Sequence, residues 1–189
     1  MNQAEIRRIL EATGAILSGH FILTSGRHSD TYIQCALVLQ YPDYAQRLGA
    51  ALAERFSGLG VECVLGPALG GIVVAHEVAR ALGVRALFTE RMDGVMKLRR
   101  GFSLSPGERV LVVEDVVTTG GSIKEAAAVA ADSGAKITGF GTLIDRSGGK
   151  VCFNAPFEAL MSVSAANWDP LECPLCRQGI PAVKPGSRR

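Results

Sequence analysis

Short apolar runs alternate with amphipathic segments through most of the chain. Apolar residues that recur with the period of a helix predict helices, whereas short continuous apolar runs predict buried strands. The helical pattern covers residues 1–13, 43–56, 71–82 and 123–133. The strand pattern covers residues 31–39, 61–65, 84–90, 109–114, 136–144 and 157–163. Residues 110–113 form the clearest strand, and their unbroken apolar run requires cover on both faces of a sheet.

The order of these elements predicts an α/β fold. Strands and helices alternate through the centre of the chain, which is typical of a parallel sheet with helices on its faces. The sequence contains no internal repeat and no low-complexity segment. We therefore expect one integrated domain with an N-terminal helix and hood (1–42), a core (43–166) and an irregular C-terminal tail (167–189).

The composition narrows the possible partners. Of the 189 residues, 48% are hydrophobic and 20% are charged, so wholesale disorder is excluded. The formal net charge of +2 lacks the strong basic excess of a nucleic-acid-binding protein. The sequence has no apolar run long enough for a transmembrane helix and no signal peptide. We expect neither a nucleic-acid partner nor a membrane partner.

Cysteine and glycine add two further expectations. The five cysteines are an odd number, which fits reduced thiols in the cytoplasm better than a disulfide framework. The 22 glycines exceed the average share of about 7%. This excess indicates either many turns or several places where the backbone approaches a ligand closely.

The segment VLVVEDVVTTGGS, residues 110–122, carries the clearest chemistry. Its strand delivers Glu114 and Asp115 to the carboxyl end of the sheet, where α/β proteins bind ligands. Paired carboxylates can accept hydrogen bonds from sugar hydroxyls or help to hold a divalent cation. A plain turn between a strand and a helix would not require them, so we favour a ligand site over that alternative.

The end of this segment, TTGGS, leads directly into a helix. Small residues before a helix expose backbone N–H groups, and together with the helix dipole these suit a phosphate. Ser122 and Glu125 have the spacing of a capping box, which places the helix start at residue 123. The Walker phosphate loop and the dinucleotide fingerprint are both absent. The expected ligand is a phosphate beside a ribose.

This segment resembles the phosphoribosyl-pyrophosphate motif of type I phosphoribosyltransferases, and from about residue 19 to residue 146 the chain resembles the orotate phosphoribosyltransferases. The resemblance implies a type I phosphoribosyltransferase fold, with a central parallel sheet flanked by helices and a small N-terminal hood. It implies that Glu114 and Asp115 hold the ribose hydroxyls, with Asp115 also catalytic. The rest of the motif would bind substrate, mainly its 5-phosphate, through Val116, Val117, Thr118, Thr119, Gly120, Gly121 and Ser122.

A second glycine-rich loop, GPALGG at residues 66–71, also opens a helix. Glycine there lets the backbone approach an anion at a helix N-terminus. The family resemblance makes this the pyrophosphate loop, often with a strained or cis peptide, and assigns Ala68, Leu69, Gly70 and Gly71 to it. A purely structural Gly-Gly turn is the alternative.

Two features favour orotate over a purine base. Residues 21–34 resemble the hood of orotate enzymes, in which Arg27 or His28 would face phosphate and Tyr32 would approach the base; His28 stands where Lys is usual. An exposed turn is the alternative role for His28. Arg146, after a strand, can pair with a carboxylate, which orotate carries and purines lack. The resemblance assigns Arg146 and Thr118 to orotate; a surface salt bridge with Asp145 or another acid is the alternative for Arg146.

A basic hairpin is expected at about residues 91–108. Asp93 and Gly94 form a hairpin turn signal, and Lys97 is the only lysine in this segment. In orotate enzymes this region is a mobile lid that reaches the active site of the partner subunit in a homodimer. The resemblance assigns Arg91 to substrate, and Lys97 is the candidate catalytic lysine. A plain solvated hairpin is the alternative.

The tail carries Cys173-Pro-Leu-Cys176, which supplies two of the four ligands of a structural zinc ion. Cys152 with His20 or His76 would complete a set only if folding happened to bring them together. We interpret the pair first as plain thiols, with structural zinc and redox use as alternatives, and we assign no residue as a metal ligand.

The sequence therefore predicts an enzyme that transfers ribose 5-phosphate from phosphoribosyl pyrophosphate to N1 of orotate in pyrimidine biosynthesis, with Mg²⁺ as cofactor. Two alternatives stay open. A purine phosphoribosyltransferase would lack a reason for Arg146. A non-catalytic regulator that senses phosphoribosyl pyrophosphate would carry a DNA-binding module or a broad basic face.

Overall fold

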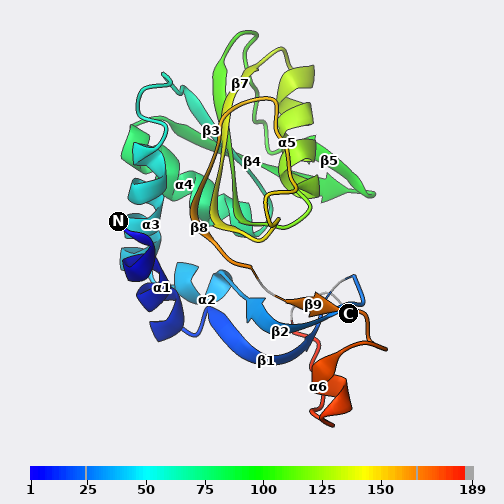
Figure 1. Cartoon of the computed structure of the whole chain (residues 1–189). Coiled ribbons are helices and arrows are strands. Elements are labelled where there is room, and N and C mark those ends of the chain that lie inside the picture. The colour runs from blue at the N-terminus through cyan, green and yellow to red at the C-terminus, as the bar shows by residue number, and fades with distance from the viewer. Residues whose placement is uncertain (24, 165, 186–189) are drawn as a thin grey trace.

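The computed structural model describes residues 1–23, 25–164 and 166–185 (Figure 1). Thr24 of the expected hood, residue 165 of the expected core and residues 186–189 of the expected tail lie outside this description. The helices are α1 (Gln3–Ala12), α2 (Ala36–Leu39), α3 (Pro42–Glu54), α4 (Gly70–Leu82), α5 (Gly121–Asp132) and α6 (Pro174–Arg177). The strands are β1 (Ile16–Ile22), β2 (His28–Ile33), β3 (Cys63–Pro67), β4 (Arg85–Met92), β5 (Val95–Leu98), β6 (Arg109–Val117), β7 (Lys136–Asp145), β8 (Phe157–Ser162) and β9 (Asn167–Trp168).

The main sheet has the strand order β5-β4-β3-β6-β7-β8. All neighbours are parallel except β4 and β5, which form an antiparallel hairpin. The chain runs from β3 outward to β4 and then crosses back to β6 on the other side of β3. The order therefore reverses between β3 and β6, and open α/β sheets bind ligands at the carboxyl ends of the two strands beside such a reversal.

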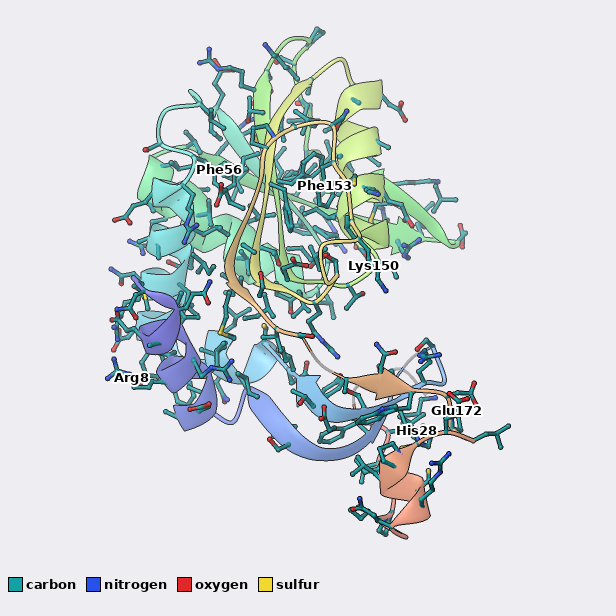
Figure 2. All side chains as sticks on the ribbon, viewed as in Figure 1. Arg8, His28, Phe56, Lys150, Phe153 and Glu172 are labelled. Atoms are coloured by element: carbon teal, nitrogen blue, oxygen red, sulfur yellow. The ribbon has the colours of Figure 1, made fainter. Side chains whose placement is uncertain are left out.

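Strand β6 is buried on both faces, as its apolar run predicts. Leu111 and Val113 belong to the core cluster formed with α1, α3 and α4. Val110 and Val112 belong to the second cluster, formed with α5. Successive side chains of a strand point to opposite faces, so one strand serves both cores. Figure 1 shows α3 and α4 on one side of the sheet and α5 on the other, and Figure 2 labels an aromatic ring from each side, Phe56 and Phe153.

A second, three-stranded sheet joins the two ends of the chain. Its order is β1-β2-β9, and both pairings are antiparallel. Ser29 of β2 pairs with Asn167 of β9, and a further bridge joins Phe21 to Val183. The expected hood and the start of the expected tail therefore share one sheet, which lies below the main sheet in Figure 1.

Four local predictions differ from the structure. The strand expected over residues 31–39 ends at Ile33, and residues 36–39 form the short helix α2. Strand β6 continues to Val117 instead of ending at residue 114, because β7 remains its partner as far as Asp145. Helix α5 begins at Gly121, two residues early, with Gly120 as its N-cap and no capping side chain. The tail, expected to be irregular, contains β9 and α6.

Within the described residues, no helix is both long and apolar enough to cross a membrane.

Candidate active site

The two predicted phosphate loops meet at the reversal of strand order. One loop follows β3 and leads into α4, and the other follows β6 and leads into α5. A Cβ atom built on Gly70, at the start of α4, would lie 2.5 Å from Cγ of Asp115 on β6. One built on Gly71 would lie 3.2 Å from Oε1 of Glu114. The structure thus brings the acidic pair of β6 directly against the loop that follows β3 and the start of α4.

The acidic pair sits in a site that disfavours two negative charges. Burial, and next the charge of Asp115, raises the pKa of Glu114 to about 9. Burial also raises the pKa of Asp115. The backbone partly compensates, since the N–H of Val116 donates to Asp115 Oδ1 at 2.8 Å. Hydroxyl donors or a cation beside these carboxylates would relieve their repulsion, which is typical of a binding site.

The loop after β6 forms one wall of a hollow of about 160 Å³. All the predicted phosphate-loop residues from Val116 to Ser122 line it, together with Glu114 and Arg91. Gly120 has φ 75°, a left-handed conformation, and a Cβ there would lie 2.8 Å from Cγ1 of Val151. The following helix directs its first N–H groups and its positive dipole end toward this hollow, as phosphate binding requires.

Arg91, which lines this hollow, pairs with a residue that the sequence interpretation missed. Its guanidinium lies 2.6 Å from Glu125 Oε2 and donates at 2.8 Å to the carbonyl of Gly94. The capping box predicted for Ser122 and Glu125 is therefore wrong, because α5 starts earlier and Glu125 pairs with Arg91 instead. The two residues are far apart in sequence, so no local pattern signals the pair.

The loop after β3 presents its first residues to solvent. Leu69 is 82% exposed, and the peptide bond between Ala68 and Leu69 is cis. The N–H of Ala68 donates to the carbonyl of Thr89 at 2.7 Å, which ties the loop to β4. A loop that exposes an apolar side chain beside two carboxylates is held by its backbone and not by burial of that side chain.

Arg146 directly follows β7 and has no ion-pair partner in the part of the chain that the structure describes. Its Nε is buried and has no hydrogen-bond partner among the described residues. Burial lowers the pKa of Arg146, and nearby Tyr32 partly counteracts this. The alternative of a salt bridge with Asp145 is wrong within the described chain, where Asp145 Oδ1 instead accepts the N–H of Ser147 at 2.8 Å. The two residues that favoured orotate, Arg146 and Tyr32, thus lie near each other.

Lys97, predicted to be catalytic, and Arg27, predicted to bind substrate, do not line the hollow. Lys97 is exposed on β5, opposite Glu90 of β4, and does not line the hollow that contains Arg91. The hairpin turn at Asp93 and Gly94 is confirmed, with φ values of 52° and 80°. Arg27 donates to the side chain of Asn167 at 2.7 Å and to its carbonyl at 3.0 Å, so it braces β9.

Neither sequence interpretation of His28 is correct. Its side chain is buried, so it is not an exposed turn residue. Its Nδ1 lies 2.8 Å from Nε2 of His20 and 3.3 Å from Sγ of Cys176, so this nitrogen faces the tail and not the phosphate loops. Arg27, its neighbour just before β2, instead donates to Asn167, so the two residues contact different surroundings.

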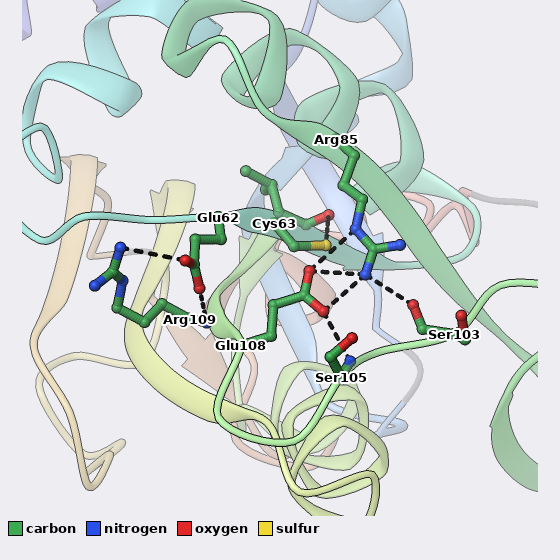
Figure 3. Close-up of polar contacts among 8 residues, drawn as sticks. Glu62, Cys63, Arg85, Ser103, Ser105, Glu108 and Arg109 are labelled. Carbon is green, nitrogen blue, oxygen red and sulfur yellow. Dashed lines mark hydrogen bonds and ion pairs between the residues drawn. The ribbon is translucent and has the colours of Figure 1, made fainter.

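The opposite end of the main sheet carries a larger hollow of about 650 Å³. Figure 3 shows that its charges neutralise one another: Arg85 donates to Glu108 at 2.7–3.0 Å, and Arg109 pairs with Glu62 at 3.3 Å. These residues lie at or beside the amino ends of β3, β4 and β6. Because these charges already pair with one another, they do not call for a charged ligand. The carboxyl ends of the strands therefore remain the candidate active site.

The acidic pair also fits Mg²⁺. Mg²⁺ prefers oxygen ligands and usually takes one or two protein carboxylates, while waters and substrate phosphates complete its shell. Glu114 and Asp115 supply this set. Burial raises the pKa of both carboxyl groups, and a cation beside them would favour their charged forms.

Comparisons with known proteins agree with this geometry. A family profile described as the phosphoribosyl transferase domain matches residues 38–169. The chain is 59% identical to orotate phosphoribosyltransferase of Pelotomaculum thermopropionicum over 100% of both sequences. It is 55% identical to the orotate phosphoribosyltransferase of Thermotoga maritima, over 97% of this chain and 98% of that protein. The solved structure of orotate phosphoribosyltransferase from Aeropyrum pernix has a TM-score of 0.68 at 26% identity, over 84% of this chain and 93% of the other.

Proposed function

The chain belongs to the orotate phosphoribosyltransferase family, and we propose that it transfers ribose 5-phosphate from phosphoribosyl pyrophosphate to N1 of orotate, with release of pyrophosphate. Family membership makes it a glycosyltransferase of pyrimidine biosynthesis. The resemblance drawn from residues 110–122 and the type I fold are confirmed by the same comparisons. The roles of individual residues, argued below, are our own assignments.

The donor binds across the two loops. Backbone N–H groups of residues 117–122 hold the 5-phosphate at the start of α5, where the helix dipole favours an anion. Glu114 and Asp115 accept hydrogen bonds from the ribose hydroxyls. Hydrogen bonds from these hydroxyls would favour the charged form of Glu114, whose pKa is raised by burial and by the charge of Asp115. The close approach of Gly70 to Asp115 supports a pyrophosphate position next to the ribose.

Orotate binds between the hood and Arg146. The guanidinium pairs with the orotate carboxylate in a bidentate manner, with Thr118 as a second contact, and Tyr32 lies against the base. Arg146 has a buried Nε without a partner in the described chain, and an unpaired buried donor of this kind is costly unless a ligand completes it. This unpaired nitrogen is the observation that favours orotate over a purine as the substrate.

Charge stabilisation is the main catalytic effect in this proposal. As the bond from C1 of the ribose to pyrophosphate breaks, positive charge develops at C1 and negative charge on the leaving group. Arg91, Lys97 and the N–H groups of residues 68–71 stabilise the leaving pyrophosphate, while Asp115 faces the ribose. Phosphoribosyltransferases generally use Mg²⁺. Bound beside Glu114 and Asp115, it would add positive charge for the pyrophosphate.

We extend the proposal to a homodimer in which the β4–β5 hairpin serves the partner's active site. Lys97 does not line the hollow of its own chain, which supports a role in a second copy. Arg27, which braces β9, would contribute charge at the rim of the same site. We place the protein in the cytoplasm because all five cysteines are unpaired thiols.

The test is consumption of orotate in the presence of phosphoribosyl pyrophosphate and Mg²⁺, run beside adenine, hypoxanthine and uracil. The proposal requires that orotate is consumed and that pyrophosphate appears in equal amount. Preference for adenine or hypoxanthine would establish the purine alternative. Binding of phosphoribosyl pyrophosphate without turnover of any base would establish the regulator.

A further inference from the structure

A cluster of four metal-ligating side chains lies outside the active site, between the small sheet and α6. It consists of His20 on β1, His28 on β2, and Cys173 and Cys176 at and within α6. One ligand atom from each residue lies within 4.8 Å of the others. Figure 2 shows His28 beside the small sheet, on the side where α6 packs. We propose that these four residues form a structural zinc site.

The separations within the cluster fit a tetrahedral shell. Zinc bonds of about 2.0–2.1 Å to nitrogen and 2.3 Å to sulfur place neighbouring ligands about 3.3–3.8 Å apart. His20 Nε2 lies 3.4 Å from Sγ of Cys173 and 3.8 Å from Sγ of Cys176. His28 Nδ1 lies 3.3 Å from Sγ of Cys176. The two histidine nitrogens are 2.8 Å apart and need to separate by about 0.5 Å to admit the ion.

The tautomer of His20 is set for metal binding. Its Nδ1 lies 2.7 Å from the carbonyl oxygen of Ile180, which can only accept, so Nδ1 carries the proton. Nε2 therefore presents a lone pair to the cluster. A second hydrogen bond from the far ring nitrogen to a carbonyl is the usual support of a metal-bound histidine. Three atoms lie near this one lone pair, and they belong to His28, Cys173 and Cys176. The lone pair can accept a hydrogen bond from only one of them.

The charge and burial of the cluster favour Zn²⁺. Two thiolates and two neutral imidazoles balance the charge of the ion, so the site would bury no net charge. His20, His28 and Cys173 are 3%, 8% and 0% exposed. Sulfur and imidazole nitrogen in a tetrahedral set select zinc over Mg²⁺, which takes oxygen ligands. Four protein ligands also close the shell, which is the property of a structural site.

The tail needs such an anchor. Within residues 169–185, Cys173 is the one buried residue. Leu171 is 89% exposed and Val183 is 57% exposed, so apolar burial contributes little to holding this segment. A zinc ion would join it to β1 and β2 across 153 positions of sequence. This position explains why a Cys-x-x-Cys pair occurs without a second pair nearby.

The first test is the metal content of the untagged full chain, purified without chelators and without added Mg²⁺. We expect about one zinc ion per chain. Cys176→Ser and His28→Gln should lose at least most of it, while the matched variants Cys152→Ser and His76→Gln, which lie outside the cluster, should keep it. Equal zinc content in Cys176→Ser and Cys152→Ser would overturn the proposal.

A second measurement uses the wild-type chain and does not depend on folding of a variant. After removal of zinc, one equivalent of Co²⁺ should give the visible absorption of a tetrahedral ion together with thiolate-to-cobalt charge-transfer bands. Trypsin should cut after Arg177 faster in the metal-free protein than after zinc is restored. A Co²⁺ spectrum without thiolate bands, or a metal-free protein with a Cys173–Cys176 disulfide and unchanged cleavage, would refute a zinc site.

Discussion

Gly70 begins α4 and Asp115 lies on β6, yet the Asp115 carboxylate occupies the space that a side chain on Gly70 would need. The contact couples the loop assigned to pyrophosphate with the residue assigned to the ribose. Glycine is required there for close approach and not for an unusual backbone angle, since its φ is not in the left-handed region. The two halves of the donor site are therefore positioned by one contact.

We expect Gly70→Ala to lower kcat/KM for phosphoribosyl pyrophosphate by about 100-fold, because the added methyl displaces the Asp115 carboxylate by roughly 1 Å. Thermal unfolding should change little, since Leu69 beside it is already exposed. Gly58→Ala is the matched control, as nothing lies within 4 Å of its Cβ position. Steady-state kinetics of both variants check this, and equal kcat/KM for the two would contradict the coupling.

The acidic pair makes stability depend on pH. Burial, and next the charge of Asp115, raises the pKa of Glu114 in the folded chain to about 9, against an ordinary value of 4.5. Between these two pH values Glu114 is protonated in the folded chain but not in the unfolded chain. Its contribution to the free energy of unfolding is therefore fully present below pH 4.5 and declines as the pH rises toward 9.

We therefore expect Glu114→Gln to raise Tm at pH 8 by about 3–6 °C, corresponding to one or two kcal/mol, and by less at pH 5. The control Glu172→Gln removes an exposed carboxylate and should shift Tm equally little at both pH values. Calorimetry of the ligand-free protein provides the measurement. A Tm for Glu114→Gln that is lower than wild type at pH 8 would show that the carboxylate stabilises the fold.

Arg146→Ala should raise KM for orotate about 10- to 100-fold, because charge-assisted hydrogen bonds to a carboxylate contribute about 1.5–3 kcal/mol. KM for phosphoribosyl pyrophosphate should change by less than about threefold, because Arg146 is assigned to orotate and not to the donor. Arg55→Ala, which removes an exposed arginine paired with Glu158, serves as control. If both substrates suffer equally, Arg146 does not recognise the base.

If the β4–β5 hairpin of one subunit serves the active site of the other, mixing two inactive variants should restore activity. Lys97→Ala and Asp115→Asn should each be nearly inactive. After unfolding and refolding together, random dimers should regain about a quarter of wild-type activity, since one site in each mixed dimer has both residues intact. Each variant refolded alone is the control. Absence of recovery in dimers shown to be mixed would mean that Lys97 acts within its own chain or is dispensable.

The features that the sequence predicted correctly are those with a local signal. The apolar run of β6 identified a strand buried on both faces, and two Gly-rich turns correctly indicated that a helix follows β3 and another follows β6. The binding of phosphate at these turns stays a prediction. The hairpin turn at Asp93 and Gly94 is equally local, because only a few residue types adopt its backbone angles readily.

The features that the sequence missed depend on partners far along the chain. Glu125 has the spacing of a capping residue, but its pairing with Arg91 depends on how the β4–β5 hairpin packs on α5. His28 follows an arginine in a turn, but its surroundings are set by residues near the C-terminus. The sequence also missed the histidines that face Cys173 and Cys176, because they lie some 150 positions earlier.

The pairing of β2 with β9 has a consequence for the order of events during synthesis. Strand β2 carries Tyr32 toward Arg146, and its outer neighbour comes from residues 167–168. The ribosome makes those residues after every strand of the main sheet. A nascent or prematurely terminated chain can thus build the sheet and both phosphate loops while the wall beside the base is still unfinished. Under the proposed function, selective recognition of the base then begins only after residues 167–168 have been made.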